Sequence, residues 1–387
     1  MELTLETISA ILLIVAALCV AGAYICLGTM RRAAAPDMRS DSDNDADDAL
    51  PSLTVIVYSE AGDDAIVECV DTIMQQDYPD LQVVVVTRAT ASHTEMLAGR
   101  FADMPGVYVT FIPPASHNLS ERKLAITIGM KAARGEVVLT TASNIRPQSD
   151  QWLRRMMAPF ANPGTELVLG FSRMDFNELS GPWRWYRQFD TMLTASQWIG
   201  YARAGKPYRG DAFNLAFRRD TFFAHKGYAS NIYLHYGDDD LFVHEIADAS
   251  NTRIVIDDAI VTTFWGHVAD RVWDTRKSRY MFTARWLPRA PFARYGAMSM
   301  MNWTALAAAT AAAIVGAPLL WPAIGAPLIW LALQAAFIAD YRILASKLLA
   351  VRLWWAIPPF LLAHPFVTLF FRIINRSLRK SNYTWQR

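Results

Sequence analysis

The sequence is short of cysteine and of net charge, and each shortage excludes a class of protein. It contains three cysteines, Cys19, Cys26 and Cys69, and no CxxC pair, so we predict neither a disulfide framework nor a zinc site. Lys and Arg number 37 against 36 for Asp and Glu, which leaves a net charge of +1. A nucleic-acid-binding protein would carry a basic face, so no nucleic-acid partner is expected. Only 19% of the residues are charged whereas 53% are hydrophobic, which suits a membrane-attached protein.

The first stretch without charge is long enough to cross a bilayer. Residues 7–30 contain no charged side chain and consist mostly of Ala, Ile, Leu and Val. A cleaved signal peptide is disfavoured because Glu2 and Glu6 stand where basic residues are usual, and because the apolar run is too long. Arg31 and Arg32 follow directly, so the positive-inside rule predicts that the chain after them is cytoplasmic.

A second region without charge, 296–339, has room for two membrane helices, which we expect to divide near 321–327. The apolar segment 348–371 is interrupted by a charge and several prolines, and either one broken span or a helix lying on the membrane surface would fit it. The tail 372–387 is strongly basic, which favours the cytoplasmic side. An even number of crossings after the central region would place it there.

The central region alternates short apolar runs with amphipathic stretches. Such a pattern predicts an α/β fold with a mostly parallel sheet that helices cover on both faces. Sheets of this kind bind ligands beyond the C-terminal ends of their strands. The predicted strands are 53–58, 81–86, 107–112 and 136–140, and the strand ends of interest are 58–62, 87–91 and 140–144.

These observations divide the chain into four parts. Residues between the first span and the central region are small and acidic and show no periodicity, which indicates a flexible tether. The parts are an N-terminal transmembrane helix at 1–30, an acidic flexible linker at 31–50, a cytosolic α/β domain at 51–291, and C-terminal membrane helices with a basic cytoplasmic tail at 292–387.

Four phrases in the central region carry a resemblance. They are "QQDYPDLQVVVV" (75–86), "SERKLAITIGMKAARGEVVLTTASNIRP" (120–147), "YRGDAFNLAFRRDTFFAHKGY" (208–228) and "HYGDDDLFVHEIA" (235–247). Together they resemble membrane-bound family 2 glycosyltransferases, over roughly residues 53–286. The resemblance implies a GT-A fold with a Rossmann-like mixed sheet, a nucleotide-sugar donor and an inverting sugar transfer at the cytoplasmic membrane face.

The phrase "GDDDL" resembles the catalytic-base motif of that family. The resemblance implies that Asp238 is the base, that Asp240 supports it and that Asp239 lies on the acceptor side. Three successive carboxylates also raise one another's pKa. The alternative is a helix N-cap, where acidic residues are favoured, and both interpretations can hold together.

The metal-binding motif of the family is altered here. Where the family has a DxD after its fourth strand, this chain has Thr141, Ala142 and Ser143. Neutral hydroxyls are poor substitutes for two anionic oxygens. Mg²⁺ or Mn²⁺ would therefore be held weakly, through Ser143, Asn144 and the donor phosphates. Glu60 or Asp63 would substitute only loosely for the family's nucleotide contact.

Cationic residues remain to neutralise a leaving diphosphate. Lys123 matches a lysine that the family places near the donor, and "RKSRY" (276–280) resembles its QxxRW element. That phase predicts donor contacts from Arg276, Arg279 and Tyr280, whereas "FTARW" (282–286) is a competing phase. An amphipathic helix on anionic lipid heads is the alternative for this segment. By resemblance Gly210 and Asn214 line the acceptor side, although a plain edge strand would fit equally well.

The sequence thus leads to two hypotheses. The first is a membrane-bound glycosyltransferase of a bacterial inner membrane, which moves a sugar from a nucleotide-sugar donor to a lipid-linked or glycan acceptor. The second is a catalytically inactive relative, kept as a scaffold or regulatory subunit for a partner glycosyltransferase or an envelope assembly protein. The changes at Thr141 and Ser143 motivate the second, and the retained "GDDDL" opposes it. A transporter is disfavoured because the apolar segments hold few ionisable groups.

Overall fold

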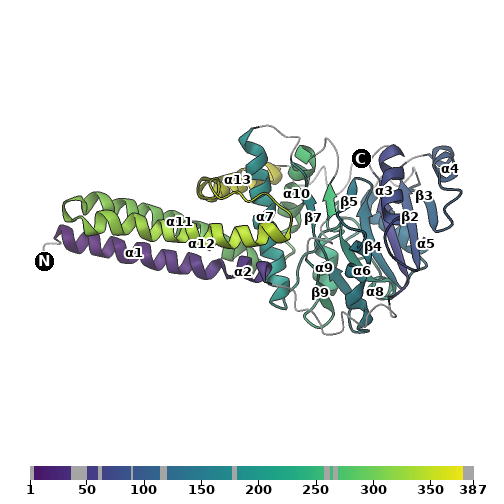
Figure 1. Ribbon diagram of the computed structural model, residues 1–387, viewed down its shortest axis with the longest axis horizontal. Coiled ribbons are helices and arrows are strands. Elements are labelled where there is room, and N and C mark those ends of the chain that lie inside the picture. The colour runs from purple at the N-terminus through teal and green to yellow at the C-terminus, as the bar shows by residue number, and fades with distance from the viewer. Residues whose placement is uncertain are drawn as a thin grey trace.

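The computed structural model describes residues 4–35, 50–59, 63–88, 90–113, 120–176, 181–256, 262–264 and 269–377. Figure 1 shows two parts, a rounded α/β domain and a long helical arm that leaves it on one side. Glu60, which was predicted to contact the donor, lies outside the described residues, as do most of the acidic linker and of the basic tail.

The first half of the domain forms because four apolar runs pair in parallel. Val55 lies opposite Val83 on one side and Leu139 on the other. The central strands are buried almost throughout, as expected when helices cover both faces. The strands are β1 (Leu53–Tyr58), β2 (Leu81–Thr87), β3 (Val107–Phe111) and β4 (Val137–Ala142), and the helices between them are α3 (Asp63–Met74), α4 (Ala91–Gly99) and α5 (Glu121–Ala132).

The second half of the domain extends this sheet with shorter strands. β8 (Leu215–Arg218) pairs antiparallel with β4, β6 (Leu167–Leu169) pairs antiparallel with β8, and β9 (Thr252–Ile254) pairs parallel with β6. The order is β3-β2-β1-β4-β8-β6-β9. The predicted mixed, mostly parallel sheet is therefore confirmed. A small second sheet has the order β5-β10-β7, formed by Ile145–Pro147, Thr262–Phe264 and Ser172–Met174.

The topology positions the site at one edge of the large sheet. Tyr58 and Ala142, the last residues of β1 and β4, lie opposite each other. The segments that follow them therefore leave the sheet together, where ligands of open α/β sheets bind. The remaining helical elements of the domain are α6 (Trp152–Met157), a 3₁₀ turn (Ala158–Ala161), α7 (Pro182–Arg203), α8 (Arg219–Ala224), α9 (Asp240–Ile246) and α10 (Ala269–Thr283).

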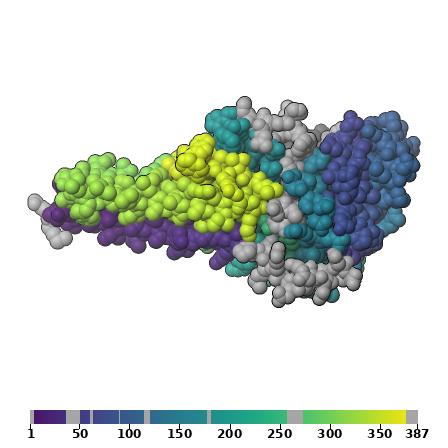
Figure 2. All heavy atoms as spheres, viewed as in Figure 1, coloured from purple at the N-terminus to yellow at the C-terminus, as the bar shows by residue number. Residues whose placement is uncertain are grey.

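The arm consists of long apolar helices. In Figure 1, α1, α11 and α12 run side by side away from the domain, and Figure 2 shows α1 packed along their length. Within the described part of the chain, four helices are long and apolar enough to cross a membrane: Leu5–Ala34, Arg289–Val315, Trp321–Lys347 and Ile357–Asn375. The elements of this part are α1 (Leu5–Cys26), α2 (Gly28–Ala34), α11 (Arg289–Val315), a 3₁₀ turn (Ala317–Leu319), α12 (Trp321–Lys347) and α13 (Ile357–Ser377).

The division between α11 and α12 falls earlier than the sequence predicts. The chain turns at Gly316–Leu320, and the segment 321–327 forms the first turns of α12. Pro322 lies within the first turn, where a helix needs no backbone N–H. A side chain at position 316 would meet Pro322 at 2.6 Å, so Gly316 permits the tight approach. The Gly and Pro residues after the turn thus start a helix instead of breaking one.

The last helix, α13, does not follow the arm. It lies at the base of the arm, beside α7 and α10 (Figure 1). His364 Nδ1 lies 3.3 Å from Asp190 Oδ1 of α7. On the opposite side, exposed apolar residues recur at positions 366, 369, 370 and 373. One apolar stripe and one anchored face favour the surface-lying alternative for this segment.

Candidate active site

The "GDDDL" segment forms a tight turn into α9. Gly237 has φ of +103°, and a Cβ there would meet Leu241 at 2.5 Å, so this turn requires glycine. Asp239 is the N-cap residue, and its carboxylate accepts a hydrogen bond of 2.8 Å from the Asp240 N–H. Capping therefore occupies the middle aspartate and leaves Asp238 and Asp240 for other partners.

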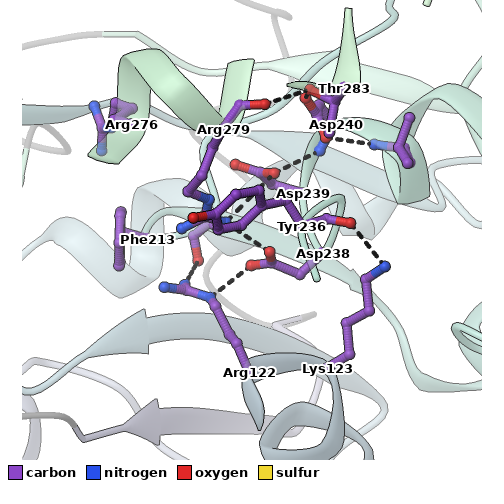
Figure 3. A network of polar contacts seen from close by, with 12 residues as sticks. Arg122, Lys123, Phe213, Tyr236, Asp238, Asp239, Asp240, Arg276, Arg279 and Thr283 are labelled. Carbon is purple, nitrogen blue, oxygen red and sulfur yellow. Dashed lines mark hydrogen bonds and ion pairs between the residues drawn. The ribbon is translucent and has the colours of Figure 1, made fainter. Parts of the chain in front are cut away.

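Asp238 is held between two arginines that approach it from opposite sides (Figure 3). Arg122 Nε lies 2.6 Å from Oδ2, and Arg279 Nη2 donates to Oδ1 at 2.6 Å. The side chain of Asp238 is only 1% exposed. Burial alone would raise its pKa, but Arg279 and Arg122 outweigh burial and hold the pKa below the ordinary value. Asp238 is thus an ionised carboxylate, as a general base must be.

Asp240 has a different environment. Its Oδ2 accepts a hydrogen bond from the Thr283 hydroxyl and lies 3.5 Å from Arg209 Nη2. Burial and the neighbouring Asp239 carboxylate raise the pKa of Asp240 to about 7. Two neighbouring carboxyl groups therefore have pKa values pushed in opposite directions.

Helix α10 brings both arginines of the "RKSRY" phase to the site. Arg279 contacts Asp238, and one helical turn earlier Arg276 Nη2 lies 3.3 Å from Asp211 Oδ1. The Phe213 ring lies 4.2 Å from the Arg122 guanidinium and 5.5 Å from that of Arg276. In the competing phase, Arg285 instead lies over the rings of residues 282 and 286. The geometry thus favours the first phase.

Lys123 contacts the protein itself. Its ammonium donates to the carbonyls of Asn231, Leu234 and Tyr236 at 2.6, 3.1 and 2.9 Å. The three protons of the ammonium are therefore all in use, and the side chain holds the loop that leads to Asp238. Burial lowers its pKa to about 8. We do not include Lys123 among the cations that face a donor.

The turn that replaces the DxD contains no carboxylate. Thr141 is buried, and its hydroxyl has no hydrogen-bond partner among the described residues. Ser143 accepts a hydrogen bond of 3.0 Å from Ser59, whereas Asn144 is partly exposed. Arg146 donates from one guanidinium nitrogen to the carbonyls of Ser143 and Ile145, each at 2.8 Å.

These residues do not fit a resident divalent cation. In the described part of the chain, no three His, Cys, Asp or Glu side chains gather into a metal site. The carboxylate of Glu68, which lies beside the turn, is paired with Arg146 at 2.8 Å. We therefore derive no catalytic step through Mg²⁺ or Mn²⁺.

One carbonyl links the turn to the base. The Ala212 oxygen accepts hydrogen bonds from Arg122 and from the Thr140 hydroxyl, each at 3.0 Å. Arg122 in turn contacts Asp238. The end of β4 and the aspartate thus belong to one polar network.

Two predicted acceptor-side residues, Asn214 and Gly210, and the predicted donor contact Tyr280 have partners within the protein. Asn214 is fully buried, accepts from the Trp152 indole at 3.1 Å and donates to the Phe171 carbonyl at 3.2 Å. A Cβ at Gly210 would lie 3.1 Å from Val243, so this glycine permits close packing. The Arg209 guanidinium lies over the Tyr280 ring, 3.8 Å from the ring centroid. The structure does not bring these three residues to Asp238.

Four residues of the network were not predicted: Arg122, Arg209, Asp211 and Phe213. Asp211 is buried and accepts from the Ser172 and Phe213 N–H groups at 2.8 and 3.2 Å, while burial raises its pKa. A signal existed for Arg122, because the buried face of α5 includes Lys123, Ile126 and Met130. This spacing places Lys123 on the buried face of α5. Arg122, the preceding residue, therefore lies on another face, beside the strand ends.

Comparison with known proteins bears on the family and the fold. Residues 52–226 match the model of glycosyl transferase family 2. A mannosyltransferase from Pyrobaculum calidifontis, solved in complex with GDP-Man and Mn²⁺, has a similar structure, with a TM-score of 0.52 at 20% identity over 94% of this chain and 99% of that one. A mycobacterial protein gives a TM-score of 0.41 at 15% identity, over 64% of this chain and 78% of its own. No curated protein matches. The fold is thus GT-A.

Proposed function

We propose, from the premise that this chain belongs to glycosyl transferase family 2 through residues 52–226, that it is an inverting transferase of a bacterial inner membrane. It moves a sugar from a nucleotide-sugar donor to a lipid-linked or glycan acceptor at the cytoplasmic face. The observation that carries the proposal is Asp238, an ionised and buried carboxylate that lies beside the strand ends where a donor would bind.

The chemistry follows from the position of this carboxylate. An acceptor hydroxyl oxygen forms a bond to the anomeric carbon while the bond from that carbon to the phosphate oxygen breaks. Asp238 takes the hydroxyl proton, and the nucleoside diphosphate leaves with the electron pair. A single displacement of this kind inverts the anomeric configuration.

Arginines neutralise the leaving group in this proposal. Arg279 and Arg276 lie one turn apart on α10, and a guanidinium binds phosphate oxygens through paired hydrogen bonds. A donor diphosphate would draw Arg279 from Asp238, which exposes the base when the donor is in place. Preorganised positive charge at the leaving group is commonly the largest contribution to such a reaction.

A second function has one observation in its favour. The turn at Thr141 and Ser143 lacks both metal-binding carboxylates, and Arg146 lies against it. If this change abolishes donor binding, the protein serves as a scaffold or regulatory subunit for a partner glycosyltransferase or an envelope assembly protein. The two arginines on Asp238 would then act as a structural clamp.

Donor binding without metal separates the two functions. We expect the purified full-length protein to gain thermal stability on titration with one member of a panel of UDP- and GDP-sugars in EDTA. GDP-Man belongs in the panel because the similar mannosyltransferase was solved with it. Saturable stabilisation that Mg²⁺ or Mn²⁺ leaves nearly unchanged supports the enzyme. The absence of a response to every nucleotide sugar, with and without metal, supports the scaffold.

A further inference from the structure

A buried ion pair joins α10 to α7 on a face of α10 that does not contact Asp238. Lys277 lies next to Arg276 in the sequence, but it is turned by about 100° around the helix axis. Its ammonium donates to the carboxylate of Asp190 on α7. The two side chains are only 6% and 4% exposed. This contact, hereafter the Asp190 pair, therefore connects the two helices in the interior of the protein.

Helix α13 contacts the same carboxylate. His364 Nδ1 lies 3.3 Å from Asp190 Oδ1 and 3.3 Å from the Tyr186 hydroxyl. Farther along α13, the centroid of the Phe371 ring lies 5.4 Å from that of Trp273 on α10. Figure 1 shows α7, α10 and α13 together at the base of the arm. Asp190 thus has partners on both of the helices that lie beside α7.

Asp190 keeps its charge in spite of burial. Burial alone would raise its pKa, but Lys277 and His364 outweigh burial and lower the pKa to about 2. A buried ion pair often stabilises a fold no more than apolar side chains of similar volume would. It does penalise any arrangement that separates its two charges, because each is then buried without a partner. The Asp190 pair is therefore suited to fix the position of α10.

The other ionic contacts of α10 are those that the proposed reaction disturbs. Arg279 contacts Asp238. Arg276 contacts Asp211. A donor diphosphate that binds both guanidinium groups weakens these contacts at the moment when α10 has to hold the two arginines in place. A slide of α10 by one helical turn would move them by about 5.4 Å, which is beyond the reach of a hydrogen bond.

We propose that Asp190 is a positioning residue for sugar transfer, which through Lys277 keeps α10 in register while Arg276 and Arg279 bind the donor. The inference rests on the proposed function and deepens it. Asp190 acts through Lys277 and does not itself touch the reacting atoms. Because its partner lies on another face of the helix, the Asp190 pair stays intact when the two arginines exchange carboxylates for phosphate.

Distances between two spin labels measure the position of α10 without any substrate. The labels are attached to Thr275→Cys on α10 and Lys131→Cys on α5, both exposed positions, after the three native cysteines are changed to alanine. The full-length protein also carries Asp238→Asn, so that Arg279 has lost its ionic partner, as it would in the donor complex. We expect Asp190→Asn to broaden or shift the distance distribution in this protein. An unchanged distribution would overturn the proposal.

Asp340→Asn is the matched control for this measurement. Asp340 is also largely buried and pairs with Arg31 at 2.8 Å, within the arm and away from α10. Its replacement should leave the distance distribution between the two labels as it is in the protein with Asp238→Asn alone. Equal broadening by the two substitutions would mean a general loosening of the fold and would contradict the proposal.

A second variant separates positioning from a fold defect. Asp190→Asn leaves the Lys277 ammonium buried without a carboxylate, whereas Asp190→Leu combined with Lys277→Met removes both charges. Such replacements commonly leave stability unchanged or raise it. We expect the combined variant to melt at or above the temperature of the parent protein and still to broaden the label distances in the presence of Asp238→Asn. A distribution as narrow as that of the parent would show that the ion pair does not fix α10.

Nucleotide-sugar titration separates this inference from the proposed function. With Asp238 intact, Asp190→Asn should weaken binding of the stabilising nucleotide sugar about tenfold or more, as loss of one charged hydrogen bond to phosphate would. Asp190→Glu keeps the carboxylate and should retain most of the affinity. Broadened label distances without any nucleotide-sugar response would retain the positioning of α10 and reject the transferase. Binding to Asp190→Asn with the affinity of the parent protein would retain the transferase and reject the positioning role.

Discussion

At the scale of single residues, the site shifts the pKa values of Asp238 and Asp240 in opposite directions, although the two residues lie only two positions apart in the sequence. Asp238 has two arginine partners and stays ionised, whereas Asp240 is buried with one distant arginine and a hydroxyl. An ionised base next to a carboxyl that can hold a proton avoids the repulsion of two buried anions. The three aspartates look alike in the sequence, and only the residues that contact them in the fold distinguish their roles.

This difference predicts a pH dependence of stability. The pKa of Asp240 is raised from its ordinary value of 3.8 to about 7 in the folded protein. Between these values the folded state keeps a proton that the unfolded state has lost, so its contribution to stability falls as pH rises from about 4 to about 7. We expect Asp240→Asn, which resembles the protonated form, to flatten the melting temperature over that window. Melting curves recorded from pH 4 to 8 would show it.

Asp248 provides the control for this experiment. It is exposed, and hydrogen bonds from the Ser250 side chain and from nearby backbone N–H groups lower its pKa. Its contribution to stability is therefore lost only as pH falls below about 4. Asp248→Asn should leave the slope between pH 4 and 7 as in the parent protein. A parent protein whose melting temperature rises steadily over this window would contradict the assignment.

The residues of the site were only partly predictable. Asp238, Arg276 and Arg279 lie in short phrases whose spacing identifies them. The periodicity of α5 gave a signal for Arg122, whereas Arg209 meets these residues only in the folded chain and no local pattern distinguishes it. Lys123 was predicted from a short sequence phrase to contact the donor. That phrase could not show that its ammonium donates to three loop carbonyls in the fold.

At the scale of elements, the turn before α9 sets the position of the base. Gly237 has a positive φ of +103°, and a Cβ added there would meet Leu241 at 2.5 Å. We expect Gly237→Ala to destabilise the fold by about 1–2 kcal/mol because an L-residue resists this conformation. It should also lower activity per folded molecule, because the added methyl displaces the segment that carries Asp238. Chemical unfolding and a transfer assay measure the two effects separately.

Gly205 is the matched control for this turn. It also has a positive φ, of +71°, and a Cβ there would meet Ala249 at 3.2 Å, away from the polar network. Gly205→Ala should cost a similar free energy of unfolding and leave activity per folded molecule nearly unchanged. Equal losses of activity in both variants would mean that α9 does not position the base.

The elements themselves were largely predictable, because the buried strands and the helix faces follow directly from apolar periodicity. The predicted strand at 53–58 is confirmed without change, and Ile66, Val70 and Ile73, which recur at helical spacing in the sequence, share the buried face of α3. The break between α11 and α12 was predicted near 321–327 but lies just before it, at Gly316–Leu320. The prediction missed this because a proline is found both at the start of helices and after their ends. A strand after Asn214 was expected only as an edge strand, whereas β8 lies between β4 and β6 and pairs antiparallel with both. The sequence could not show this, because pairing order and direction depend on distant segments.

At the scale of the whole molecule, polar contacts join the helices of the arm to one another near the domain. Arg31 of the N-terminal helix pairs with Asp340 of α12 at 2.8 Å, and Lys347 donates to the Ala35 carbonyl at 2.6 Å. The basic residues at the domain end of the arm fit a cytoplasmic position for the domain.

The most direct test measures sugar transfer by the full-length protein in lipid vesicles, with EDTA present and with the nucleotide sugar that stabilises it. The account predicts that nucleoside diphosphate is released with formation of a labelled glycolipid. It also predicts that Asp238→Asn lowers this rate about 10²- to 10⁴-fold while donor binding persists. Transfer by Asp238→Asn at the parent rate, or transfer by the parent protein that stops when metal is removed, would contradict it.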